Sequence, residues 1–220
     1  MSKELEEVVI HLREDLSILL EIKEKGTIRT KMISVETLMD CLKGSVSGFT
    51  FSTGILPQNF VSVSVNTGKK QQYVVVEFQD ERADITYRQT EFKDFPLPRL
   101  LFGFCLEESG RISRVNLGVP AQGKLKPDTP MYYYPFSNVS RFAMCTGSNT
   151  LPHIKDLQQV QNLPYYILSF PDNDDHYTDR HNKPGLCHRE LMEHLQDKDR
   201  QYYYDHILVP MEGVTLKNFL

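Results

Sequence analysis

The 220-residue sequence contains no apolar run approaching the roughly 20 residues that a membrane-spanning helix needs. Its net charge is only −4, so composition gives no support for binding to nucleic acid or to an anionic membrane surface. The N-terminus, Met1 to Glu7, is charged and lacks the apolar core of a signal peptide. These absences predict a cytoplasmic protein with neither a nucleic acid nor a membrane as its partner.

Motifs for metals, disulfides and nucleotides are also lacking. The four cysteines, Cys41, Cys105, Cys145 and Cys187, are far apart and form no Cys-x-x-Cys pair, which disfavours a zinc site and a disulfide framework. There is no Walker A loop, no GxGxxG and no GxSxG. We therefore expect no cofactor and no metal, and we treat each cysteine as a separate thiol. Cys41 and Cys105 stand among apolar neighbours and are expected to be buried.

Four histidines gather near the C-terminus, at positions 176, 181, 188 and 194, close to the acidic residues of segment 172–175. No two of them have the i, i+4 spacing that places both histidines of a zinc protease on one helix face. Solvated polar side chains are therefore the better interpretation of His176, His181, His188 and His194 than a metal site.

The hydrophobic pattern predicts one α+β domain over residues 1–220, with an antiparallel β-meander and flanking helices. A hairpin is expected over 16–33, with Gly26 in its turn, followed by a helix that Ser34 caps and Gly44 ends. Alternating or continuous apolar residues predict further strands at 60–65, 73–78, 83–87, 100–106, 112–119 and 131–136. The first three of these strands are expected to pair in chain order.

After residue 150 the pattern becomes helical. Ile154, Leu157 and Val160 form an apolar stripe, and a helix is expected from about residue 185 to 197. The apolar segment 163–170, which Pro164 interrupts, fits either a strand or a buried helix.

Cys145 has the most informative surroundings in the chain. An aromatic strand leads into a Pro-containing loop with Asn138, and Cys145 follows seven residues later. The small and polar residues 146–149 come next, which suits a loop rather than a core. A cysteine thiolate is a nucleophile, and a polar loop before it can donate a hydrogen bond to a developing oxyanion. The alternative from the residues alone is a buried thiol at the end of a strand.

This order of elements is similar to that of ubiquitin-conjugating enzymes, in which a His-Pro-Asn element precedes the catalytic cysteine. More specifically, the chain resembles the bacterial family D of the ubiquitin-conjugating superfamily, which includes protein B of the PRTRC plasmid system. The resembling features are Phe95-Pro-Leu-Pro98, Lys126-Pro-Asp-Thr-Pro-Met-Tyr132, Pro135-Phe-Ser-Asn-Val139, Cys145-Thr-Gly147 and Leu151-Pro152. The histidine of the His-Pro-Asn element is missing, with Tyr134 or Pro135 in its place.

The resemblance implies a ubiquitin-conjugating-like core over about residues 14–165 with a C-terminal extension over 166–220. It implies that Cys145 accepts a ubiquitin-like protein as a thioester from a ThiF-like activating enzyme, with a JAB-type peptidase as a further possible partner in the same system. Asn138 would donate to the oxyanion, and His153, or an acidic residue of the 172–175 loop, would take the proton of the acceptor.

Two other interpretations stay open. One is a catalytically inactive adaptor of the same fold, with Cys145 merely packed, because the histidine of the His-Pro-Asn element is missing. A buried and unreactive Cys145 would favour it. The other is a plasmid or phage accessory protein of an unrelated α+β fold.

Overall fold

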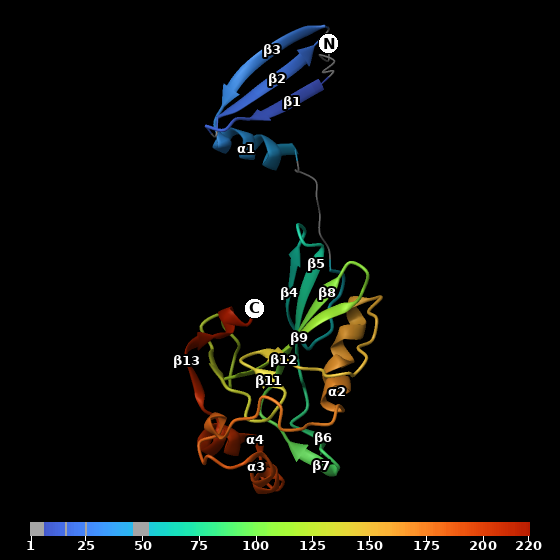
Figure 1. Cartoon of the computed structure of the whole chain (residues 1–220), viewed down its shortest axis with the longest axis vertical. Helices are drawn as coiled ribbons and strands as arrows, with labels where there is room; N and C mark the ends of the chain where they lie inside the picture. Colours follow the sequence, from blue (N-terminus) through green and yellow to red (C-terminus); the bar gives the residue numbers. More distant parts are fainter. Residues whose placement is uncertain (1–6, 16, 25, 46–52) are drawn as a thin grey trace. The chain divides into compact units, whose positions relative to one another are not determined.

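The chain forms two compact units, Met1–Gly54 and Ile55–Leu220 (Figure 1). The computed structural model describes residues 7–15, 17–24, 26–45 and 53–220. The sequence led us to expect a single domain over residues 1–220, whereas the structure divides at residue 54. The division follows from strand pairing, since the described strands of each unit hydrogen-bond only to strands of the same unit.

The first unit is a three-stranded antiparallel sheet with one helix. Its strands, in the order β1-β2-β3, are β1 (Glu7–Leu12), β2 (Ile18–Glu24) and β3 (Thr27–Ile33). Gly26 takes the positive φ of +76° that the predicted hairpin turn requires. The predicted helix is α1 (Val35–Ser45), whose first turn receives a hydrogen bond from the Thr37 amide to the Ser34 hydroxyl. It runs through Gly44, where we expected it to end. Leu16 and Lys25 of the predicted hairpin lie outside the described residues.

The second unit is built on an antiparallel sheet with the strand order β11-β12-β9-β8-β5-β4. The bounds are β4 (Phe60–Asn66), β5 (Gln71–Glu77), β8 (Leu101–Glu107), β9 (Ile112–Pro120), β11 (Val139–Ser140) and β12 (Ala143–Met144). At one edge, β10 (Pro130–Tyr132) pairs with both β9 and β13 (Pro210–Thr215).

Strands β6 (Arg82–Tyr87) and β7 (Thr90–Pro96) form a separate two-stranded hairpin. The prediction that the strand at 83–87 continues the meander is therefore wrong. Strand β5 pairs with β8 instead, with Val76 opposite Phe102 and Val74 opposite Phe104. All four of these side chains are fully buried. Pairing with β8 thus sets buried apolar side chains of the two strands side by side.

Most of the short helices of the second unit pack on one face of this sheet, whereas the last of them places Leu216 beside Val75 and Leu101 on the opposite face. They are η1 (Leu157–Asn162), α2 (Leu163–Leu168), η2 (Asp179–His181), α3 (His188–Leu195), α4 (Arg200–Tyr202), η3 (Tyr203–Ile207) and η4 (Leu216–Asn218). The ambiguous segment 163–170 is therefore helical as far as Leu168, with Pro164 in the first turn, where its missing N–H costs nothing. The expected strand at 131–136 is only the three residues of β10, because the chain turns into the core from Tyr134 onward.

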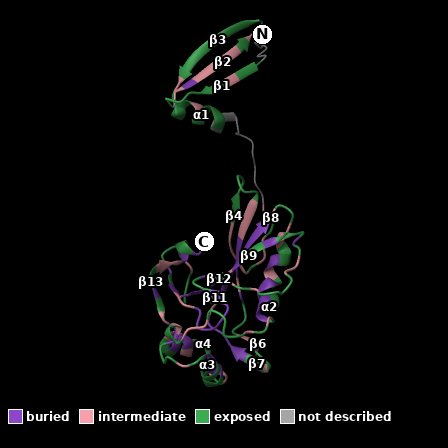
Figure 2. Ribbon diagram, viewed as in Figure 1, coloured by how far each residue is buried: buried purple, intermediate pink, exposed green. Residues whose placement is uncertain are grey.

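The C-terminal part of the chain belongs to the same hydrophobic core as the sheet. Leu191, Tyr203 and Ile207 are fully buried and pack in one cluster with Phe102 and Phe104 of β8. Figure 2 shows buried residues along both β8 and α2. Residues 166–220 thus complete the domain, where the sequence suggested an extension added to a finished core.

Removal of the Tyr203 hydroxyl tests whether the C-terminal part of the chain is packed into this core. Tyr203 is fully buried, and its hydroxyl donates a 2.7 Å hydrogen bond to the carbonyl of Pro96. Tyr203→Phe leaves that carbonyl buried without a donor, so we expect the free energy of unfolding to fall by about 1–3 kcal/mol. Tyr166→Phe is the matched control, since Tyr166 also donates to a backbone carbonyl at 2.7 Å but is exposed. Equal losses of stability in urea unfolding of the two variants would contradict a buried role for residue 203.

Candidate active site

Cys145 stands at the base of a two-residue β-hairpin. Strands β11 and β12 pair Val139 with Met144 and Ser140 with Ala143. One step further from the turn, the amide of Cys145 donates a 2.7 Å hydrogen bond to the carbonyl of Asn138. The hairpin therefore explains the spacing of seven residues between Asn138 and Cys145, because it places them opposite each other.

The hairpin is fixed to the central sheet on its other side. Ala143 pairs with Asn116 of β9, and the Leu117 amide donates to the carbonyl of Phe142 at 2.8 Å. The Phe142 side chain is buried and meets the ring of Phe219 edge-on, with centroids 5.1 Å apart. The sheet thus supplies a rigid support for a loop residue that reaches solvent.

Cys145 itself is exposed. The alternative in which it is a packed thiol is therefore wrong for this structure. Of the other cysteines, Cys105 is buried as expected, whereas Cys41 is exposed. The prediction for Cys41 failed because α1 leaves most of its apolar side uncovered, with Val35 and Met39 also exposed.

Asn138 is almost completely buried, with 9% of its surface exposed. Its amide donates to the carbonyl of Asp175 at 2.7 Å, and its side-chain nitrogen Nδ2 donates to Oδ1 of Asp172 at 2.8 Å. Its φ of +62° lies in the left-handed region, which asparagine tolerates better than most residues. Asn138 therefore joins the Cys145 hairpin to the acidic loop at 172–175.

Asp172 is the carboxyl group next to Asn138. Burial raises its pKa from the ordinary value of 3.8 to about 6, and the hydrogen bond from Asn138 opposes part of that shift. The backbone of Asp172 is held at both ends, since its amide donates to Thr86 and its carbonyl accepts from the Arg88 amide, each at 2.7 Å. The β6–β7 hairpin, which stands apart from the sheet, thus anchors the acidic loop.

A second carboxylate, Asp174, ties the same loop to three side chains. It accepts a 2.6 Å hydrogen bond from the Tyr87 hydroxyl, forms an ion pair with Arg88, and lies 3.2 Å from Nδ1 of His188. The hydrogen bond from Tyr87, with further help from Arg88 and His188, lowers the pKa of Asp174. The pKa is therefore raised at Asp172 and lowered at Asp174, although the two residues are only two positions apart.

His188 is buried, with 3% of its surface exposed, so its interpretation as a solvated side chain is wrong. Its ring stacks on Tyr177 with centroids 4.5 Å apart and lies 4.3 Å from the ring of Tyr87. Burial lowers its pKa, which favours the neutral imidazole. Within the described part of the chain, no group of three His, Cys, Asp or Glu side chains is arranged to hold a metal ion.

His153 lies in a different place from the hairpin of Cys145. It is exposed and packs over Gly110, in the turn between β8 and β9. A side chain at Gly110 would meet it, since an added Cβ would stand 2.7 Å from Cε1 of His153. The adjacent Ile154 amide donates to the Gly110 carbonyl at 2.8 Å. Within residues 53–220, no hydrogen bond joins His153 to Cys145 or Asn138.

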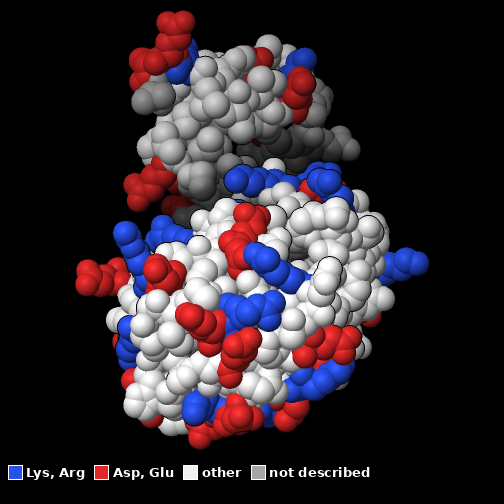
Figure 3. Space-filling view, turned by 60° about the horizontal axis from the view of Figure 1, so that its bottom comes forward, with Lys and Arg blue, Asp and Glu red and all other residues white. Residues whose placement is uncertain are grey.

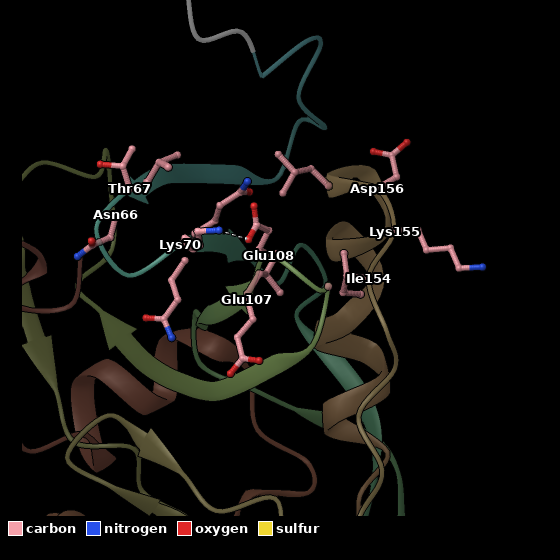
Figure 4. A pocket seen from close by; sticks show the side chains of 14 residues that line it. Asn66, Thr67, Lys70, Glu107, Glu108, Ile154, Lys155 and Asp156 are labelled. Atoms are coloured by element: carbon pink, nitrogen blue, oxygen red, sulfur yellow. Dashed lines mark hydrogen bonds and ion pairs between the residues drawn. The ribbon is translucent and has the colours of Figure 1, made fainter.

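A pocket of about 430 Å³ adjoins this turn (Figure 4). Lys70 and Glu108 form an ion pair of 3.0 Å at its rim, while Lys155 points away from it. Charges of both signs line it, including Glu107 and Asp156. The face of the second unit that Figure 3 shows likewise carries Lys and Arg interspersed with Asp and Glu, without a large area of one sign.

The sequence singled out Cys145 and Asn138, which the structure pairs, but gave no sign of the groups that hold the acidic loop. Tyr87 and Arg88 lie about 85 residues before Asp172 and Asp174, and no spacing rule connects them. A weak signal existed in His188, because a histidine between the apolar residues of a predicted helix can face the core.

Asp172 makes stability depend on pH in a direction that can be tested. Its pKa is higher in the folded protein than in the unfolded chain, so its contribution to the free energy of unfolding falls as pH rises from about 4 to 6. Asp172→Asn keeps the acceptor for Asn138 and removes the charge. We expect it to be more stable than the native protein by about 2 kcal/mol at pH 8, with no gain at pH 4.

Asp174→Asn is the control, because the pKa of Asp174 is lowered and its ionised form stabilises the fold. This variant should lose stability at pH 8 rather than gain it. Urea unfolding of both variants at the two pH values makes the comparison. A gain for Asp172→Asn that is the same at both pH values would contradict the assignment.

A sequence model of prokaryotic E2 family D matches residues 35–211. The match spans well over half of the chain, so the protein belongs to this family and has a ubiquitin-conjugating-like α+β fold. No curated protein and no solved structure matches it. E2-like proteins as a class act with activating enzymes and ubiquitin-like proteins. None of the helices in the described ranges has the length and apolar character needed to cross a membrane.

Proposed function

We propose that this protein carries a ubiquitin-like protein as a thioester on Cys145 and transfers it to an acceptor. The observation that carries the proposal is the exposed Cys145 placed opposite Asn138 at the base of a hairpin. Membership in an E2 family makes thioester transfer the chemistry to expect of such a cysteine.

In the loading step, the Cys145 thiolate attacks the thioester carbonyl at the C-terminus of the modifier on a ThiF-like activating enzyme. A new carbon–sulfur bond forms to Cys145, and the cysteine of the activating enzyme leaves as a thiolate. No proton needs to be stored in this exchange, because one thiolate replaces another. The exposure of Cys145 supports the step, since the carbonyl must approach the sulfur from solvent.

The side chain of Asn138 is the candidate donor to the tetrahedral oxyanion. Its Nδ2 carries two hydrogens, and only one of them is used in the bond to Asp172. The hydrogen bonds to Asp175 and Cys145 fix the backbone of Asn138, and the bond to Asp172 fixes its side chain. The side-chain amide is therefore held in place before the reaction begins. A donor fixed in this way lowers the barrier because it needs no reorganisation during catalysis.

In the discharge step, we assign proton removal from an acceptor amine to Asp172. A carboxyl with a pKa of about 6 is mostly ionised at pH 7 yet remains basic enough to accept a proton. The amine forms a carbon–nitrogen bond, the bond to Cys145 breaks, and the sulfur leaves as a thiolate. His153 has no hydrogen bond to the residues of the described hairpin, so Asp172 is the better candidate.

One observation favours a second function, that of an inactive adaptor. The position that precedes Pro135 in the Pro-Phe-Ser-Asn segment is Tyr134, which is buried in the core rather than placed beside Cys145. A missing histidine would leave the fold intact as a binding surface for the same partners. A JAB-type peptidase of the same system is a further candidate partner in either case.

Reconstitution separates the two functions. The full chain is incubated with a ThiF-like activating enzyme, its ubiquitin-like protein and ATP, and the products are separated on a non-reducing gel. The carrier predicts a band shifted by one modifier, which thiol reductant removes. Binding of the partners without a reductant-sensitive band would support the adaptor and reject the carrier.

A further inference from the structure

A pocket of about 420 Å³ lies beside the hairpin that carries Cys145. Its walls come from three segments: the hairpin itself, with Arg141; the loop after the acidic segment, with His176 and His181; and strand β13, with Met211 and Val214. Tyr133 forms part of the apolar surface and stacks on His181, with ring centroids 4.2 Å apart. The pocket thus combines an apolar floor with nitrogen-bearing side chains.

The charge of this pocket is one-sided. No Asp or Glu lines it, although the chain has more acidic than basic residues. Across the ranges that the structure describes, the guanidinium of Arg141 makes no ion pair and no hydrogen bond. Burial lowers the pKa of His181, so its ring offers a neutral hydrogen-bonding group there. A guanidinium keeps its charge at every physiological pH. An anionic group is therefore the complement of this site.

The pocket is also tied to the reaction centre. Two of its walls meet at Asn138, because Val139 and Ser140 follow it directly and the carbonyl of Asp175, next to His176, accepts from its amide. Cys145 directly follows β12 and comes two residues after Ala143, which pairs with Ser140 of the pocket wall. Two residues of a strand span about 7 Å, which is therefore the distance along the strand from Cys145 to this wall. A peptide whose last residue is joined to Cys145 would reach the pocket with a residue two to four positions earlier.

We propose that this pocket binds an acidic side chain in the C-terminal tail of the ubiquitin-like modifier, with Arg141 as the residue that determines specificity. The inference rests on the proposed carrier function. The modifier is preferred over the acceptor as the occupant because a lysine acceptor is cationic and Arg141 would repel it. The tail, in contrast, stays attached to Cys145 for the whole life of the thioester.

Peptide aryl thioesters test the proposal without partner proteins. Three hexapeptide probes differ only at the third residue before the C-terminus, which is Glu, Gln or Lys. Acylation of Cys145 in the full chain is followed by intact mass, and the site is confirmed by digestion. We expect the Glu probe to react about 3- to 10-fold faster than the Lys probe, since one partly exposed charge pair is gained and one repulsion is avoided.

Arg141→Glu should invert this ratio, and Arg141→Gln should bring it close to one. Because each ratio is taken within one variant, a general loss of folded protein cancels. Arg114→Glu is the matched control, since it makes the same charge change on β9, away from this pocket, and should keep the native preference.

The results distinguish failure of the pocket assignment from failure of the carrier function. Equal rates for the three probes, a preference for Lys, or a preference for Glu that Arg141→Glu leaves unchanged would each overturn the pocket assignment and leave the carrier function standing. If no probe acylates Cys145 while iodoacetamide alkylates it, both the carrier function and the pocket assignment are rejected.

Discussion

Replacing Cys145 with serine is expected to convert a reductant-sensitive adduct into one that survives reductant. The serine oxygen can accept the same acyl group, but the resulting oxyester is not cleaved by thiols. It should form more slowly, because a hydroxyl at neutral pH holds far less of its nucleophilic anion than a thiol does. Cys145→Ala should form no adduct at all. Reconstitution with the activating enzyme, the modifier and ATP, followed by gels with and without reductant, measures both variants.

The other exposed cysteines of the described chain supply the controls. Cys187→Ser and Cys41→Ser change thiols that also face solvent, so they should keep the full adduct and its sensitivity to reductant. An adduct that persists in Cys145→Ala and disappears in Cys187→Ser would move the site to another residue. An adduct that persists in all single variants would contradict attachment through one particular thiol.

Replacing Asn138 with glycine is expected to slow acylation of Cys145 by about 100- to 1,000-fold, the loss typical for removal of one oxyanion donor. Glycine is chosen because residue 138 has a positive φ, which alanine would adopt only with strain. The backbone bonds to Asp175 and Cys145 are then preserved while the side-chain amide is lost. The rate is measured with the peptide thioester probes by intact mass.

Asn149→Gly is the matched control for this variant. Asn149 lies in the exposed loop after Cys145 and donates only to the nearby carbonyl of Thr146, at 3.0 Å. It should acylate at the native rate. In Asn138→Gly, alkylation of Cys145 by iodoacetamide should stay near the native rate, because that reaction forms no oxyanion. Equal losses in acylation and alkylation would indicate a collapsed loop and would contradict a specific role for the amide.

The site could be predicted from the sequence as far as it depends on local structure. The seven-residue spacing of Asn138 and Cys145 is a property of one short hairpin, so neighbouring residues determine it. The exposure of Cys145 followed in the same way from the polar residues 146–149 after it. Family membership, which the match over residues 35–211 confirms, was predicted from short motifs between residues 95 and 152.

The groups that surround the hairpin could not be predicted, because they depend on pairing between distant segments. Asp172 reaches Asn138 only because β6 and β7 leave the meander and hold the acidic loop through Thr86 and Arg88. The choice of β8 over β6 as the partner of β5 rests on burial of apolar residues on both strands, which alternation within one strand does not reveal. His188 was misread for the same reason, since its partners Tyr87 and Phe136 come from other elements.

The most direct test of the account is the chemical identity of the bond on Cys145. The full chain is loaded with the modifier in the complete system, digested without reductant, and analysed by tandem mass spectrometry. We predict a peptide containing Cys145 joined through its sulfur to the C-terminal carboxyl of the modifier, and loss of this species after treatment with reductant. Recovery of the same peptide with an unmodified Cys145, while the activating enzyme is fully charged, would contradict the central claim.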